Sequence, residues 1–142
     1  MTPPGTRLTV HVFSFGFKFS GPPPDESGHG GGFVFDCRAL PNPFWDEALR
    51  PYSGREAPVA AFMERHAEVA AYAGHAWSLV RYTAAVYRGL GRERLMVSFG
   101  CTGGRHRSVY MAELIAARLR EEDIDVALVH RDMERPGAGE PL

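Results

Sequence analysis

The sequence has a single lysine, Lys18, and only two cysteines, Cys37 and Cys101. Two cysteines without a C-x-x-C pair or paired histidines exclude a disulfide framework and argue against a zinc site, so we expect neither a metal nor a cofactor. No apolar run is long enough to span a bilayer, and no signal-peptide pattern stands at the start. The sequence therefore predicts a cytoplasmic protein with no membrane partner.

An excess of charge of one sign is also missing. The net charge is −1, so no overall field favours nucleic acid or anionic lipid, and a polyanion would need a local patch. The 142 residues, 44% of them apolar, suit one globular domain. We expect a single domain over 1–142, with its core at about 7–132, a mobile Pro/Gly-rich loop at 20–32 and a loose tail at 133–142.

Hydrophobic periodicity predicts strands that alternate with helices. We expect strands at 7–15, 33–37, 94–99 and 126–130, a helical region at 58–90 that breaks near His66, and a helix at about 105–121. Strands joined through helices imply right-handed crossovers, and hence an α/β fold with a mainly parallel sheet of about four strands and helices packed on it. Apolar residues at helical spacing in 58–90 are assigned to the core: Val59, Phe62, Met63, Val69, Tyr72, Ala73, Ala76, Leu79, Val80 and Thr83.

The segment 100–108 is a glycine-rich turn between the strand at 94–99 and the helix that follows. Glycines here allow a positive φ, and the turn directs backbone N–H groups and a helix N-terminus at one point, where an anion binds. The spacing also fits C-x-x-G-x-x-R-S, the phosphate loop of cysteine-dependent phosphatases. The predicted phosphate cradle consists of Cys101, Thr102, Gly103, Gly104, Arg105, His106, Arg107 and Ser108. The alternative is a sharp turn whose basic residues face water.

Other polar residues follow the ends of the predicted strands. In parallel sheets ligands bind beyond the carboxyl ends of the strands, so Lys18, Arg38 and Asn42 are expected to converge with Arg107. Ordinary solvated positions for Lys18 and Arg38 remain the alternative.

Several short motifs together resemble the C-terminal domain of the RapZ/YvcJ family. They occupy residues 14–18, 33–36, 40–43, 45–46, 100–110 and 130–132, in order and with family-like spacing. Family members usually carry an N-terminal nucleotide-binding domain with a Walker motif, but this chain has no G-x-x-x-x-G-K-[ST] sequence. The chain therefore resembles a stand-alone C-terminal domain.

The resemblance implies a regulatory binding domain. In the best-known members this domain binds glucosamine-6-phosphate and a small regulatory RNA, which it presents to an endoribonuclease. By motif, the phosphosugar pocket maps onto Thr102, Gly103, His106, Arg107 and the position of Phe44. Sensor members are expected to carry a histidine at that last position. A phenyl ring cannot hydrogen-bond a sugar, so a phosphate-bearing ligand is implied but not that particular sugar. The basic tail of enterobacterial members is also missing, which weakens the electrostatic part of RNA affinity.

We accordingly expect a binder of a phosphorylated small molecule, either a phosphosugar or a nucleotide, rather than an enzyme. The alternative is a cysteine-dependent phosphatase. In it Cys101 would be the nucleophile, activated by Arg107, Ser108 would assist the leaving thiolate, and Asp46 or Asp36 would be the general acid. Against it, Gly100 stands where tyrosine phosphatases usually have a histidine.

A third hypothesis, compatible with the first, is an adapter that contacts RNA or an RNA-processing protein. Its patch would combine arginines with aromatic rings, namely Arg50, Arg55, Arg105, Phe44, Trp45 and Tyr52. A mere scatter of arginines is the alternative, and a homo-oligomer is left open.

The two cysteines are expected at one edge of the sheet. If their strands are neighbours, Cys37 and Cys101 come close enough for a reversible disulfide, whereas an intervening strand would prevent one. Two inert buried thiols are the other possibility.

Overall fold

Four strands form one parallel sheet in the computed structural model, which describes residues 7–26, 28 and 31–136. The strands lie in the order β2-β3-β1-β4, and each neighbouring pair is parallel. The predicted α/β class and parallel sheet are thereby confirmed. The elements are β1 (Thr9–Gly16), β2 (Phe33–Asp36), α1 (Ala57–Glu64), α2 (Ala67–Gly89), β3 (Arg94–Cys101), α3 (Arg107–Glu121) and β4 (Asp125–His130).

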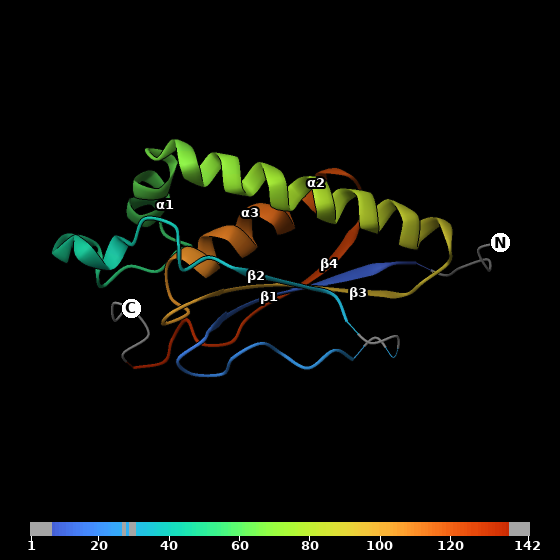
Figure 1. The fold of residues 1–142 in the computed structure, drawn as a ribbon, viewed down its shortest axis with the longest axis horizontal. Helices are drawn as coiled ribbons and strands as arrows, with labels where there is room; N and C mark the ends of the chain where they lie inside the picture. Colours follow the sequence, from blue (N-terminus) through green and yellow to red (C-terminus); the bar gives the residue numbers. More distant parts are fainter. Residues whose placement is uncertain (1–6, 27, 29–30, 137–142) are drawn as a thin grey trace.

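The helices gather on one face of the sheet (Figure 1). Helix α3 packs directly against β1, β3 and β4, and α2 packs across α3 and β3. The segment that follows β1 runs along the opposite face (Figure 1). One face of the sheet therefore packs against the helices, and the segment after β1 covers part of the other face.

The burial pattern along the strands explains this core. Burial alternates along β1 from Thr9 to Ser14, as expected for a pleated strand with one face on the core. In β3, an inner strand of the sheet, every residue from Leu95 to Cys101 is buried. Helix α3 contributes a wide apolar face, because it is covered on most sides. The fully buried members include Val10, Val12, Leu95, Val97, Phe99, Val80, Met111, Ile115 and Leu119.

The helical region breaks at His66, which caps α2, as the sequence predicted. The assignment of Leu79 to the core was wrong: this side chain is 52% exposed. The buried stripe of α2 runs instead through Val69, Ala73, Ala76, Val80 and Ala84, because small residues let the helix approach the layer beneath it.

The loop after β2 is ordered by two single-turn 3₁₀ helices, Pro43–Trp45 and Glu47–Leu49. Proline excludes a helix interior but is tolerated at a first helical position, where its missing N–H has no helical partner to lose. Pro43 therefore starts the first turn, and Asn42 caps it.

Candidate phosphate-binding site

The predicted cradle lies between the end of β3 and the start of α3. Gly104 has a φ of +79°, a conformation that favours glycine. Among the described residues, no hydrogen-bond partner is found for the backbone N–H groups of Gly103, Gly104, Arg105 and His106. Four successive unpaired donors just before a helix N-terminus form an arrangement that favours an anion.

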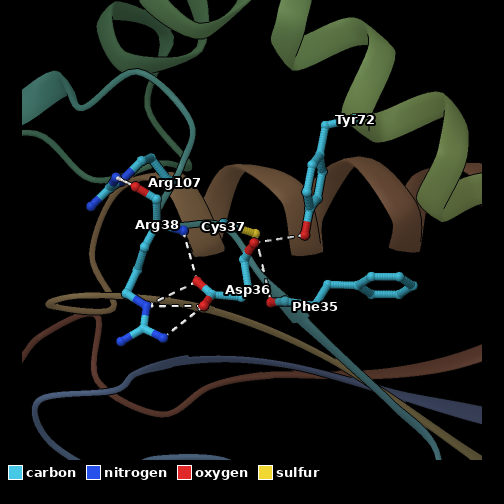
Figure 2. Close-up of polar contacts among 6 residues, drawn as sticks. All are labelled: Phe35, Asp36, Cys37, Arg38, Tyr72 and Arg107. Atoms are coloured by element: carbon cyan, nitrogen blue, oxygen red, sulfur yellow. Dashed lines mark hydrogen bonds and ion pairs between the residues drawn. The ribbon is translucent and has the colours of Figure 1, made fainter.

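Two buried polar atoms beside these donors also lack partners, namely Oγ1 of Thr102 and Nε of Arg107. The Arg107 side chain is fixed by its other nitrogen, since Nη1 donates to the carbonyl oxygens of Arg38 at 2.7 Å and Leu40 at 3.1 Å. Figure 2 shows Arg107 reaching over the end of β2 to Arg38.

Arg107 is only 3% exposed, yet it belongs to none of the ion pairs among the described residues. A buried guanidinium without a carboxylate is costly, because carbonyl dipoles compensate its lost hydration only in part. The site therefore holds a buried positive charge next to unsatisfied donors.

Cys101 and Ser108 face each other at the base of the cradle. The Cys101 thiol donates to Oγ of Ser108 at 3.1 Å, and the backbone N–H of Ser108 donates to Sγ at 3.5 Å. Both residues are buried. The sulfur thus lies where the first turn of α3 presents its N–H groups.

Arg105 and His106 use their side chains to hold neighbouring backbone. Arg105 donates to the carbonyl oxygens of Met133, at 2.9 Å, and of Pro51. His106 Nε2 lies 2.7 Å from the carbonyl oxygen of Tyr52, which can only accept, so Nε2 carries the proton. Burial lowers the pKa of His106 to about 4, so the ring is neutral at pH 7. The two side chains therefore hold the neighbouring segments in place, and the backbone N–H groups of the same residues stay unpaired among the described residues.

Arg38 is paired with its near neighbour Asp36. Its guanidinium lies 2.6 Å from the Asp36 carboxylate (Figure 2). It also lies 3.9 Å from the centre of the Phe17 ring. The pKa of Asp36 is lowered, chiefly by the side-chain hydrogen bonds from Arg38. Asp36 is thereby held as a carboxylate, which is the wrong form for a general acid.

The remaining predicted residues lie on the loops around the cradle. The backbone N–H of Lys18 donates to the carbonyl oxygen of Thr102 at 3.1 Å, which places the 17–20 turn beside the cradle. Asn42 is buried, and its Oδ1 accepts the backbone N–H of Phe44 at 3.1 Å. Asp46 is exposed and caps the second 3₁₀ turn, accepting from the N–H of Ala48 at 3.0 Å.

Sequence reasoning gave no role to Asp132, which is 1% exposed and joins three segments. Its carboxylate accepts the N–H of Gly16 at 2.8 Å and the hydroxyl of Ser20 at 2.6 Å. Its Cβ also packs beside Gly104. The only sequence signal was the motif at 130–132, which indicated a family but no function.

A second cluster was also missed. Oγ of Ser14 lies 2.6 Å from Nδ1 of His130, whose Nε2 lies 2.6 Å from the carboxylate of Glu113. The order Ser-His-Glu resembles a hydrolase triad, but Ser14 is fully buried and faces α3. The cluster therefore ties β1 and β4 to α3.

The described part of the chain contains neither a cluster of metal ligands nor a membrane-spanning helix. Its histidine, cysteine and acidic side chains form no group of three able to hold a metal ion. Its helices are each too short or too polar to traverse a bilayer.

Known proteins share this sequence over nearly its whole length. A family model described as the RapZ C-terminal domain matches residues 8–134. A "Nucleotide-binding protein" of Laribacter hongkongensis is 47% identical over 129 residues, covering 91% of this chain and 44% of that protein. Proteins of the same description from Halorhodospira halophila and Trichlorobacter lovleyi are 45% and 42% identical, covering 89% and 92% of this chain.

The chain spans less than half the length of these relatives, 42% to 44%. The similarity includes the cradle, the 16–20 turn and the loop after β2, all of which lie within the matched residues. The chain thus belongs to the family of the RapZ C-terminal domain.

Proposed function

We propose that the cradle binds the phosphate group of a small molecule, a phosphosugar or a nucleotide, and that the chain acts as a regulatory binding domain. The observation that carries this is Arg107, a buried guanidinium with an unpartnered Nε and no ion pair among the described residues. A phosphate would supply the missing countercharge and accept from the free N–H groups of the turn. The relatives described as nucleotide-binding proteins support a phosphate-bearing ligand.

The orphaned hydroxyl of Thr102 offers a sharp test. Thr102→Val removes a buried group that has no partner, so the free protein should be as stable as wild type or slightly more stable. The same change should weaken phosphate binding, because the ligand loses one donor. Thr83→Val on α2, far from the cradle, is the matched control.

The measurement is thermal unfolding with inorganic phosphate, ribose 5-phosphate and the nucleoside 5′-monophosphates. A ligand at one hundred times its Kd should stabilise the wild-type protein by about 2.7 kcal/mol. Thr102→Val should raise the ligand concentration that is needed to reach this stabilisation, and Thr83→Val should leave it unchanged. If no phosphate compound stabilises the wild-type chain, the proposal is wrong.

The contact between Cys101 and Ser108 supports a second candidate, a cysteine-dependent phosphatase. Hydrolysis of a phosphate ester by the wild-type protein, abolished by Cys101→Ser, would establish it. Unchanged phosphate binding in Cys101→Ser together with no turnover in wild type would reject it. The pairing of Asp36 with Arg38 favours the binder, because it removes one proposed general acid.

An adapter role would extend the same proposal, with ligand occupancy altering contact with RNA or with an RNA-processing protein. Exposed Arg50 and Arg55 lie on the loop beside the cradle, together with exposed Trp45 and Tyr52. Affinity for a single-stranded RNA should then fall steeply between low and moderate salt. An RNA affinity that does not change with salt concentration would rule out an electrostatic contact through this patch.

A further inference from the structure

We define an aromatic shelf as Phe44, Trp45 and Arg50, which lie on the loop after β2. Trp45 is 73% exposed, which is unusual for the largest apolar side chain. The Arg50 guanidinium lies 4.3 Å from the centre of the Phe44 ring, and its Nε donates to the Phe44 carbonyl oxygen at 2.7 Å. A planar cation is thus held against an aromatic ring, and among the described residues Arg50 forms no ion pair.

The shelf is fastened to the cradle on both sides. Before it, Arg107 binds the carbonyl oxygen of Leu40. After it, Arg105 binds the carbonyl oxygen of Pro51, and His106 binds that of Tyr52. The residues that form the cradle therefore also hold both ends of the loop that carries the shelf.

The shelf is also preformed. Asn42 caps the 3₁₀ turn through the N–H of Phe44, and Pro43 fixes its first residue. Side chains on a fixed turn lose little conformational freedom when a planar group stacks on them. The exposed ring of Trp45 and the guanidinium of Arg50 present flat surfaces of the kind on which nucleic-acid bases stack.

We propose that the ligand is a nucleoside 5′-phosphate, with its phosphate in the cradle and its base stacked on the aromatic shelf; this rests on the proposed phosphate site. A phosphosugar has no planar π face, so it gains nothing from Trp45 or from the guanidinium of Arg50. Stacking accepts any base, so the shelf selects for the presence of a base more than for its identity.

The experiment uses the Trp77→Phe chain, in which Trp45 is the only tryptophan left of the two. The four common nucleoside 5′-monophosphates, ribose 5-phosphate and inorganic phosphate are titrated, with Trp45 fluorescence and calorimetry as readouts. The tightest nucleotide should bind at least about tenfold more strongly than ribose 5-phosphate and should quench Trp45.

Trp45→Ala in the otherwise wild-type chain should lower nucleotide affinity to that of ribose 5-phosphate and leave ribose 5-phosphate binding unchanged, as measured by calorimetry. Tyr82→Ala is the matched control, because Tyr82 is an aromatic residue of similar exposure, 72%, on α2. Equal affinity for the nucleotide and for ribose 5-phosphate would show that the base does not stack on the shelf, and it would leave the proposed phosphate site unaffected. Failure of every phosphate compound to bind would overturn both.

Discussion

The backbone N–H of Cys37 donates a 2.7 Å hydrogen bond to the carbonyl oxygen of Gly100, which extends the β2–β3 pairing by one residue. Cys37 therefore lies beside Cys101, which follows Gly100 on the neighbouring strand. The geometric condition for a disulfide, that the two strands be neighbours, is met. Both residues are free thiols.

Burial nevertheless makes Cys37 unreactive. The side chain is fully buried, and desolvation raises the pKa of its thiol far above the usual range. The thiolate is the form of cysteine that acts as a nucleophile. In the folded protein we therefore expect Cys37 neither to react with iodoacetamide nor to attack an oxidised Cys101 to form a disulfide. Mass spectrometry after mild peroxide should find no Cys37–Cys101 bond, and alkylation of Cys37 should follow unfolding. A disulfide formed under native conditions would contradict this.

Gly104→Ala should destabilise the protein by at least about 2 kcal/mol. The residue has a φ of +79°, and an added Cβ would lie 2.5 Å from the backbone nitrogen of Gly16. The left-handed conformation alone costs about 1–2 kcal/mol, and the backbone of Gly16 cannot move aside without breaking its bond to Asp132. Urea denaturation measures the loss.

Gly74→Ala is the control for this substitution. Gly74 lies within α2, and nothing is found within 4 Å of its added Cβ. Alanine should therefore stabilise the helix by about 0.5–1 kcal/mol. Equal effects of the two substitutions would show that the close contact at Gly104 is not a constraint.

Asp132→Asn should cost about 3 kcal/mol, because a buried carboxylate loses its hold on several donors. Burial alone would raise its pKa, but hydrogen bonds from Ser20, Gly16 and Arg135 lower it below the usual value. The wild-type contribution is therefore complete above the unfolded-state pKa and is lost as pH falls through the lower, folded-state value. Denaturant titrations from pH 7 to acid should show this loss in wild type and a flatter profile in the variant.

Asp125→Asn provides the comparison, because Asp125 also accepts from an arginine, Arg7, but in an exposed pair. Exposed pairs contribute about 1 kcal/mol or less. If Asp125→Asn lowered the free energy of unfolding as much as Asp132→Asn, burial would not explain the effect at Asp132.

His106 should make stability depend on pH below neutrality. Its pKa falls from 6.5 to about 4 on folding, chiefly through burial, so the unfolded chain binds the proton more readily. The stabilisation is fully present above pH 6.5 and is lost as pH falls toward 4, by about 3 kcal/mol in all. His106→Gln keeps an N–H donor for Tyr52 and should flatten the profile in this window. An unchanged slope in that variant would assign the titration to another group.

The sequence predicted what depends on local pattern. The alternation in β1, the uninterrupted β-rich run of β3, the break at His66 and the glycine turn before α3 each depend on residues that are close together in the sequence. These elements could therefore be predicted from the sequence without knowledge of the fold.

Other features depend on contacts between distant segments. Asp132 binds Gly16, and His130 binds Ser14, across more than one hundred residues. The side chains of Arg105 and His106 end on backbone carbonyls, which every residue has and which no sequence motif marks. Leu79 fits the helical period of the buried face, and only the layer beneath α2 decides which part of that face is covered.

The strand order has a consequence for synthesis on the ribosome. β1 is made first, but its partners are β3, where Thr9 meets Arg94, and β4, where Thr9 meets Asp125. β2 also pairs with β3. No pairing in this sheet can therefore begin before β3 has left the exit tunnel, several seconds after β1 at about 5–20 residues per second. Until then the apolar side chains of β1 remain uncovered, so the nascent chain is a natural client for a chaperone that shields hydrophobic segments.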